Sequence, residues 1–263
     1  MSTLITRVRQ RQIGQAIDAG TRLDGRSLGD YREMTIEEGL IERAEGSARI
    51  RLGKTEVLVG VKIATGEPFP DTPNEGVLTV NAELVPLASP AFEPGPPDEN
   101  SIELARIVDR GIRESKAIDT AKLVIEPGKK VFVVFVDVYV LNHDGNLIDA
   151  SALAAVSALA NTKMPNYEIK EGEVKIKTGY SPLPLKSHPI TVTLAQINGK
   201  LVVDPWVEEE QVMDARISMA INDEGNICAI QKGGSGFFTP QQILEASKLA
   251  QEKAAELRKK LGW

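Results

Sequence analysis

The hydrophobic positions along this chain fall into short runs that predict two groups of β-strands. In the first half, five runs bounded by turn residues read as strands: Ala48–Leu52, Glu56–Ala64, Gly76–Leu87, Ala121–Ile125 and Lys130–Asn142. Gly53-Lys54 separates the first two runs and predicts a hairpin. The last run is apolar on both faces through its first half, which is typical of a strand at the centre of a sheet.

A second group of strands follows in the C-terminal half. Asn198-Gly199 separates the runs Ile190–Ile197 and Lys200–Asp204, and this dipeptide is a strong hairpin signal. A second hairpin is predicted with a polar turn between its two strands, Ala215–Ile221 and Ile227–Lys232.

Apolar spacing and capping residues predict helices beside these strands. The first helix covers Leu4–Ala19 and ends at Gly20. The second covers about Asn100–Asp119, after a proline-rich loop, with Asn100 and Glu103 spaced as a capping box.

Two further helices are expected. Asp149 has a side chain suited to cap a helix over Ala150–Ala160. Thr239 and Pro240 suit the N-cap and first position of a final helix, which Gly262 ends.

This order of elements predicts an α+β protein with two mixed β-sheets and packed helices in a loosely duplicated arrangement. We expect an N-terminal helix and arm at 1–30, a first subdomain at 31–165 and a second at 166–263. The 263 residues are 42% hydrophobic, which is enough for a substantial core.

The second predicted helix carries three arginines on one face. Arg106, Arg110 and Arg113 are spaced by four and three residues, which brings their side chains to one side of a helix. Guanidinium groups suit bidentate contacts with phosphate, so one interpretation is an anion-binding face. The other is a solvated salt-bridge face built from the pairs Glu103–Arg106, Asp109–Arg113 and Arg110–Glu114. Spacing alone leaves both open.

Composition narrows the class of protein. The formal net charge is −6, so a local basic face is more informative than it would be on a basic protein. No run of 18 apolar residues is present, which predicts no membrane span. The N-terminus lacks the apolar block of a signal peptide, so we expect a cytoplasmic protein.

The residues that most often ligate metals or act as nucleophiles are few. One cysteine and two histidines cannot build a zinc site of the usual kind. Cys228 lies in an apolar run and is expected to be a buried small hydrophobe, and His143 and His188 are expected to be structural. Acidic residues at Asp204, Glu208, Glu209, Glu210 and Asp214 read as a solvated loop.

Four segments together resemble the RNase PH superfamily: Leu23-Asp-Gly-Arg26, Glu103–Arg113, Val138–Gly145 and Val202–Glu210. Their order and spacing are specific, and the resemblance covers nearly the whole chain from about residue 20. Within the superfamily the chain is most similar to the larger, non-phosphorolytic ring subunits of the archaeal exosome. The resemblance implies the RNase PH fold.

Active members of this family use inorganic phosphate to attack the 3′-terminal phosphodiester of RNA and release a nucleoside diphosphate. Such chemistry needs arginines for the RNA backbone, a pocket for the attacking phosphate and carboxylates for proton transfer or metal binding. By resemblance, Arg106 and Arg110 match the arginines that contact RNA, and Arg113 shares their face.

The phosphate site of the family is degenerate in this chain. Active members resemble Asp-Gly-Gly-Thr-Arg after the central strand, whereas here Asp144-Gly145 continues as Asn146, Leu147, Ile148 and Asp149. Ile148 stands where the arginine would be. We expect Asp149 to repel an anion there, because like charges about 4 Å apart repel by roughly 4 kcal/mol at an effective dielectric constant of 20.

The carboxylates of the family are only partly retained. Asp204 matches the first of two aspartates, and Glu210 replaces the second. We therefore expect no catalytic residue in this chain and assign no metal site, although the sequence leaves open whether Asp204 and Glu210 retain a metal. Inorganic phosphate, and any divalent metal, would bind in a partner subunit.

The resemblance implies partners. The chain would pair with a catalytic RNase PH-like paralogue, and three such heterodimers would close a ring that carries a trimeric RNA-binding cap and takes in single-stranded RNA. Two alternatives stay open: an independently active phosphorolytic 3′–5′ exoribonuclease, and a purely structural ring scaffold. Arg7, Arg9 and Arg11 fit either an RNA-facing arm or a solvated helix face.

Overall fold

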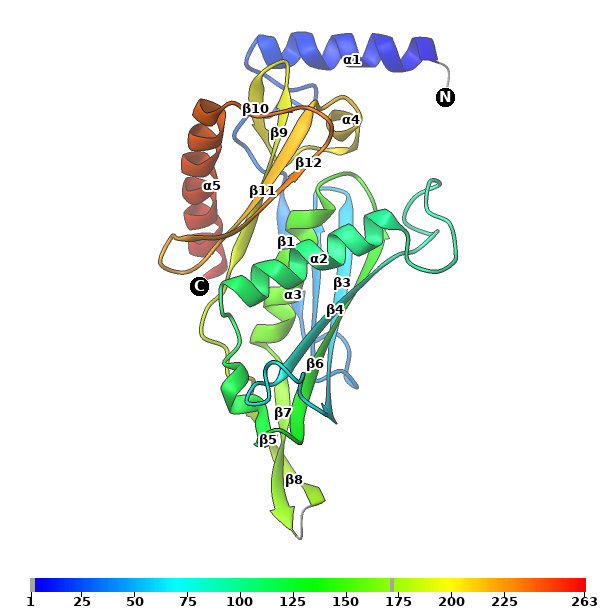
Figure 1. The fold of residues 1–263 in the computed structure, drawn as a ribbon. Helices are drawn as coiled ribbons and strands as arrows, with labels where there is room; N and C mark the ends of the chain where they lie inside the picture. The colour runs from blue at the N-terminus through cyan, green and yellow to red at the C-terminus, as the bar shows by residue number, and fades with distance from the viewer. Residues whose placement is uncertain (1–2, 171–172) are drawn as a thin grey trace.

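Two β-sheets with a helix between them form the body of the molecule (Figure 1). The computed structural model describes the backbone of residues 3–170 and 173–263 and the side chains of residues 8–168 and 177–263. The helices, with one 3₁₀ segment, are α1 (Thr3–Asp18), α2 (Glu99–Glu114), η1 (Thr120–Leu123), α3 (Leu147–Ala160), α4 (Val207–Glu210) and α5 (Pro240–Leu261).

Most of the strands lie where the hydrophobic pattern predicts them. The strands of the first half are β1 (Met34–Glu38), β2 (Gly46–Leu52), β3 (Thr55–Gly66), β4 (Val77–Leu84), β5 (Val124–Glu126) and β6 (Lys130–Asn142). Those of the second half are β7 (Lys163–Lys170), β8 (Glu173–Pro182), β9 (Ile190–Ile197), β10 (Lys200–Val203), β11 (Ala215–Ile221) and β12 (Ile227–Gly233).

The first sheet has the order β1-β2-β3-β6-β4, with β5 also paired to β6. Its neighbours are antiparallel except β4 and β6, which run parallel and are joined through α2. The predicted hairpin around Gly53-Lys54 joins β2 to β3. As its apolar run indicates, β6 lies inside the sheet between β3 and β4.

The second sheet has the order β10-β9-β11-β12 and is antiparallel throughout, so the prediction of a mixed sheet holds only for the first one. A separate hairpin, β7–β8, extends away from the body (Figure 1). The sequence pattern missed this hairpin because lysines and glutamates interrupt its apolar positions.

The helix α3 is the centre of the fold. It contacts β2 and β3 of the first sheet, β9 of the second sheet, and α2. Every residue from Ile148 to Leu159 is buried, and many of them are alanine or serine, whose small side chains allow this close approach on all sides.

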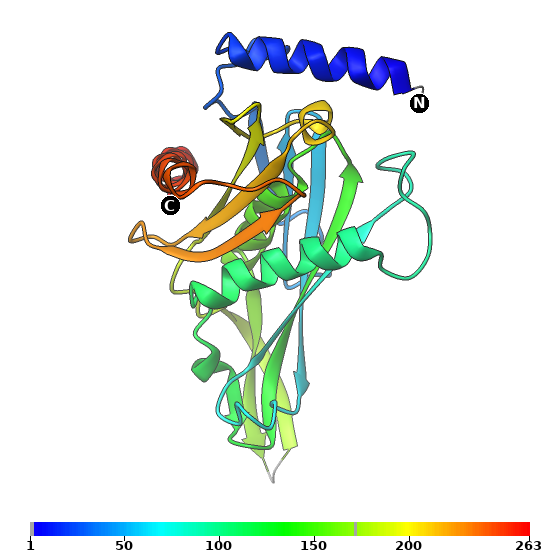
Figure 2. The same ribbon diagram turned by 45° about the horizontal axis from the view of Figure 1, so that its top comes forward.

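The two terminal helices pack on the second sheet. Ala246, Ala250 and Ala254 are fully buried where α5 contacts β9 and β11. Its predicted cap is confirmed, because the Thr239 hydroxyl accepts a hydrogen bond from the Gln242 N–H, followed by Pro240 at the helix start. In Figure 2, α1 lies across the tip of this sheet, anchored through Ile13 and its neighbours in a small apolar cluster.

Two details of α2 differ from the sequence prediction. Asp98, not Asn100, is the N-cap, since its carboxylate accepts a hydrogen bond from the Ser101 N–H at 2.8 Å. The helix ends at Glu114 rather than Asp119. Across the described residues, no helix combines the length and the apolar character that crossing a membrane requires.

Candidate functional site

The arginine face of α2 is exposed, as its spacing predicts. Arg106 has no hydrogen-bond or ion-pair partner among the described residues. Arg110 makes one long contact, 3.4 Å, to the side chain of Gln231. Arg113 is held by Asp109 at 2.7 Å and by the carbonyl oxygen of Leu78 at 3.1 Å.

Only one of the three expected salt bridges on this helix is present in the described structure. Asp109 pairs with Arg113, whereas Glu103 turns to Arg216 of β11 instead of Arg106. The salt-bridge interpretation of this face therefore holds for Arg113 alone. Arg106 and Arg110 keep their guanidinium groups available to an external anion.

The start of α3 differs from the prediction at its cap. Asn146, in a left-handed conformation with φ of 51°, is the N-cap, and Asp149 lies within the first turn. The expectation that Asp149 caps this helix is wrong, because Asn146 holds the cap position and its side-chain oxygen accepts a hydrogen bond from the Asp149 N–H. Leu147 begins the helix, and Ile148 is buried at 8% exposure against the core.

Asp149 is enclosed by donors from three elements. Its carboxylate accepts hydrogen bonds from the Tyr31 hydroxyl at 2.8 Å, the Thr193 hydroxyl at 2.7 Å and the Asn146 side-chain amide at 2.9 Å. Burial raises the pKa of Asp149 to about 6, although these hydrogen bonds act to lower it. Because it is buried against β9, it is not the carboxylate that an incoming anion would meet first.

That carboxylate is Glu210. One of its oxygens accepts a hydrogen bond from the backbone N–H of Asn146 at 2.8 Å. This N–H at the start of α3 is therefore already hydrogen-bonded within the protein. Burial raises the pKa of Glu210 to about 7. The same side chain lines a hollow shared with His143, Ile148 and Arg216.

The acidic segment after β10 is not the solvated loop that its composition predicts. Asp204 is fully buried, and both of its oxygens are engaged: by Arg32 at 2.7 and 2.9 Å, Arg26 at 2.9 Å and Asn146 at 2.8 Å. Burial acts to raise the pKa of Asp204, but the hydrogen bonds and charge of Arg32 outweigh it and lower that pKa.

A second buried pair lies beside this one. Arg22 and Glu209 are 3% and 1% exposed and form a two-pronged ion pair, with the Arg22 Nε donating to Glu209 at 2.9 Å. Arg22 also donates to the carbonyl oxygens of Val203 and Asp204, each at 2.8 Å. The segment after α1 is thereby fixed to the second sheet.

The described residues contain no group of three or more histidine, cysteine, aspartate or glutamate side chains arranged to hold a metal ion. The donor set around Asp204 does not suit a cation either, since two arginines already neutralise its carboxylate.

The remaining single-residue predictions have mixed outcomes. Cys228 is only partly buried, so the prediction of a buried small hydrophobe is wrong; it lies in β12, the edge strand of the second sheet. His143 stacks on Phe92 with ring centroids 5.3 Å apart, and His188 packs on Trp263 at 5.2 Å, as structural residues would.

The arginines of α1 are also only partly described. Arg9 forms an ion pair with Glu208 of α4, and Arg11 is exposed. The side chain of Arg7 lies outside the described residues.

The arginines that hold Asp204 and Glu209 were missed as site residues. The sequence offered one signal, the segment Leu23-Asp-Gly-Arg26, which entered only as part of a family resemblance. In the structure Arg26 reaches Asp204 across 178 residues of chain, and Arg32 reaches the same carboxylate across 172. Arg32 also donates to the carbonyl oxygens of Asp144 and Gly145, which fixes the turn that leads into α3.

Family models match most of the chain. The first domain model of the 3′ exoribonuclease (RNase PH) family matches residues 30–165, and the second matches residues 187–253. The chain therefore belongs to the 3′ exoribonuclease family of the RNase PH fold.

Individual relatives are closely similar. The chain is 56% identical over 244 residues to "Exosome complex component Rrp42" of Thermococcus onnurineus, which covers 92% of this chain and 90% of that protein. It is 53% identical over 258 residues to the protein of the same description from Pyrococcus horikoshii, covering 97% and 94%.

Solved structures agree with this assignment. The structure described as the Archaeoglobus fulgidus exosome with RNA bound to the active site includes a chain with a TM-score of 0.90 and 45% identity, covering 98% of this chain and 99% of that one. A chain of an archaeal exosome core matches with a TM-score of 0.87 and 42% identity, covering 99% and 98%.

Proposed function

We propose that this chain is a non-catalytic ring subunit of an archaeal exosome. It would structure the active site of a catalytic RNase PH-like paralogue and contribute arginines to 3′–5′ phosphorolytic RNA degradation. The similarity to exosome components over more than nine-tenths of their length supports the assignment to such a complex. The finer roles rest on the chemistry of the site.

One observation carries the non-catalytic role: the start of α3 holds a carboxylate where a phosphorolytic enzyme needs an anion pocket. Glu210 accepts the Asn146 N–H, and the buried Ile148 supplies no positive charge. A phosphate entering here would find the Asn146 N–H already taken by Glu210 and an apolar side chain at Ile148 where the family has an arginine.

The RNA-binding role rests on α2. Arg106 and Arg110 are exposed and lack a carboxylate partner in the described structure, so binding a phosphate would not first require breaking an ion pair. Arg113 lies on the same face but forms an ion pair with Asp109, so we assign it a smaller contribution to RNA binding. Single-stranded RNA is the ligand that fits such a face in this family.

The assembly we propose is a ring of three heterodimers with the catalytic paralogue, carrying a trimeric RNA-binding cap, in the cytoplasm. This chain needs no cofactor of its own in that arrangement. Inorganic phosphate, and any divalent metal, would bind in the partner.

The test is to assemble the chain with its paralogue after replacing two arginines, Arg106→Gln and Arg110→Gln. We expect an intact ring whose affinity for single-stranded RNA falls about tenfold or more, with a shallower dependence on salt concentration because phosphate contacts are lost. The control ring carries Arg43→Gln and Arg51→Gln, which are exposed arginines away from α2.

The same experiment tests the scaffold alternative. If the arginines only join subunits, the double variant would fail to assemble, as measured by analytical ultracentrifugation. An intact ring with unchanged RNA affinity would contradict the RNA-binding role.

A further inference from the structure

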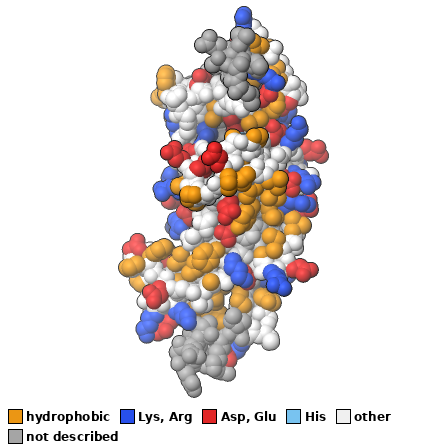
Figure 3. All heavy atoms as spheres, turned by 90° about the vertical axis from the view of Figure 1, so that its right-hand side faces the viewer, with side chains coloured by type: hydrophobic (Ala, Val, Ile, Leu, Met, Phe, Trp, Pro, Cys, Tyr) orange, Lys and Arg blue, Asp and Glu red, His pale blue; other side chains and the backbone are white. Residues whose placement is uncertain are grey.

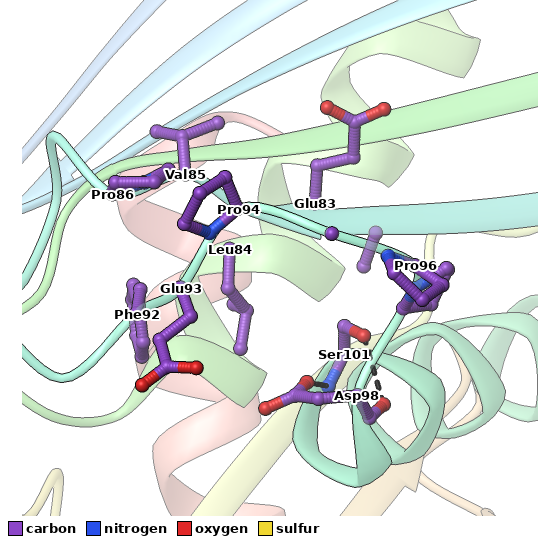
Figure 4. A pocket seen from close by; sticks show the side chains of 13 residues that line it. Glu83, Leu84, Val85, Pro86, Phe92, Glu93, Pro94, Pro96, Asp98 and Ser101 are labelled. Carbon is purple, nitrogen blue, oxygen red and sulfur yellow. Dashed lines mark hydrogen bonds between the residues drawn. The ribbon is translucent and has the colours of Figure 1, made fainter.

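A hollow of about 310 Å³ lies between the end of β4, the loop that follows it and the start of α2. Figure 4 shows its lining, and we call it the acidic groove, defined by residues 82–86, 92–98 and 101. Leu84, Val85 and Phe92 give it apolar surface, and prolines of the loop form much of the rest.

The groove carries negative charge and no compensating cation. Its lining includes Glu83, Glu93 and Asp98 but no lysine, arginine or histidine. Asp98 is occupied as the cap of α2, whereas Glu83 and Glu93 are exposed and have no hydrogen-bond or ion-pair partner in the described part of the chain. In Figure 4 these two carboxylates lie on opposite sides of Pro94.

An acidic residue, Asp137, also lies on the neighbouring strand, β6. Tyr139 of β6 lies beside Glu83 in the sheet register. Burial, Glu83 and Asp137 together raise the pKa of the Tyr139 hydroxyl, as expected near uncompensated carboxylates. Figure 3 shows this side of the molecule, where hydrophobic side chains gather with acidic ones among them.

The groove is preformed. Proline fixes its own φ, and four prolines lie in the loop from Pro90 to Pro97, so the backbone there has little freedom to lose. Phe92 is held by its stack on His143. Binding a ligand in the groove would therefore cost little conformational entropy for ordering the loop.

Charge complementarity selects the kind of ligand. RNA phosphates would be repelled by the unpaired carboxylates, whereas a lysine or arginine side chain would lay its apolar stem along Leu84 and Phe92 and present its charge to Glu93. We propose that the acidic groove binds a basic segment of the paralogous subunit, in which a lysine or arginine adjoins an apolar residue. This inference rests on the proposed assembly.

The groove and the arginine face lie at different positions along the same helix, α2. Asp98 caps α2 at the groove, and Arg106 lies eight residues further, about 12 Å along the helix axis. The acidic start of α2 would hold a protein neighbour while its basic middle faces RNA.

The test reverses both unpaired carboxylates, Glu83→Lys and Glu93→Lys. The control reverses two exposed glutamates outside the groove, Glu42→Lys and Glu67→Lys. Affinity for the purified paralogous subunit is measured by isothermal titration calorimetry at about 50 and 300 mM salt, with circular dichroism to check folding. We expect affinity to fall at least about tenfold at low salt for the groove variant only, with a smaller difference at high salt.

Hydrogen exchange gives an independent readout, because residues 82–98 should gain protection when the wild-type chain binds the paralogue. Equal affinities for the groove and control variants, or no protection of 82–98, would overturn the groove assignment alone. A groove variant that only binds RNA more tightly would also overturn it. Failure of the wild-type chain to bind the paralogue would instead overturn the proposed function, and this inference with it.

Discussion

Three carboxylates near the start of α3 have pKa values that their surroundings shift in different directions. Arg32 keeps the pKa of Asp204 low, whereas burial raises the pKa of Asp149 to about 6 and that of Glu210 to about 7. The Glu210 carboxylate accepts a hydrogen bond from the backbone N–H of Asn146, whereas Asp204 is held directly by arginine side chains.

Glu210 therefore makes stability depend on pH. Its folded pKa lies above the ordinary value of 4.5, so the folded state binds the proton more tightly and wild-type stability falls as pH rises from about 4.5 to about 7. We expect Glu210→Gln to raise the free energy of unfolding by about 2 kcal/mol at pH 8 and to change it little at pH 5. Guanidinium unfolding at the two pH values measures this, and an equal effect at both would contradict it.

The buried pair of Arg22 and Glu209 should be costly to break. Arg22→Met leaves the Glu209 carboxylate buried without its cation, which we expect to lower the free energy of unfolding by about 3–5 kcal/mol. The matched control is Arg51→Met, which removes the exposed pair with Glu56 and should cost less than about 1 kcal/mol. Equal costs in denaturant unfolding would show that the buried pair has no special role.

Sequence reasoning failed at these residues for a physical reason. Asp204 and Glu209 look like a solvated acidic run because their partners are far away in the chain: Arg22 and Glu209 are 187 residues apart. Local pattern contains no information on such pairing, so Arg22 and Arg32 were not predicted and Arg26 entered only through the resemblance to a family.

At the scale of elements, periodicity predicted where strands and helices lie better than where they are capped. The hairpins at Gly53-Lys54 and Asn198-Gly199 and the cap at Thr239 follow from local turn chemistry and are confirmed. The cap of α3 is Asn146 rather than Asp149, because Thr193 and Tyr31, from other elements, hold the aspartate inside.

The turn before α3 gives a prediction at this scale. Gly145 has φ of 85°, and a Cβ there would lie 2.5 Å from the backbone of Trp206. Gly225 has nearly the same φ, 81°, with nothing within 4 Å of its Cβ position. We expect Gly145→Ala to cost about 3–5 kcal/mol and Gly225→Ala about 1–2 kcal/mol, the cost of the left-handed conformation alone.

Thermal or denaturant unfolding of the two glycine variants separates the effects. The difference between them isolates the clash with the backbone at α4 from the conformational strain that they share. Similar losses of stability would show that the close approach to Trp206 relaxes without cost.

At the scale of the whole molecule, the fold was predictable from the family resemblance and the hydrophobic pattern together. The distribution of charged side chains over the surface could be seen only in the structure. The net charge of −6 is not spread evenly: carboxylates gather at the acidic groove and arginines on the middle of α2. A subunit that supplies one basic face to a shared RNA path has no need to be basic overall, in contrast to a protein that binds RNA alone.

The central claim is that this chain binds RNA for a partner and does not cleave it. The most direct measurement incubates the purified chain with short single-stranded RNA and inorganic phosphate and records nucleoside diphosphate release. We predict no release from the folded chain alone, and phosphate-dependent shortening once the paralogous subunit is added. Release by the chain alone that disappears when phosphate is omitted would contradict the account.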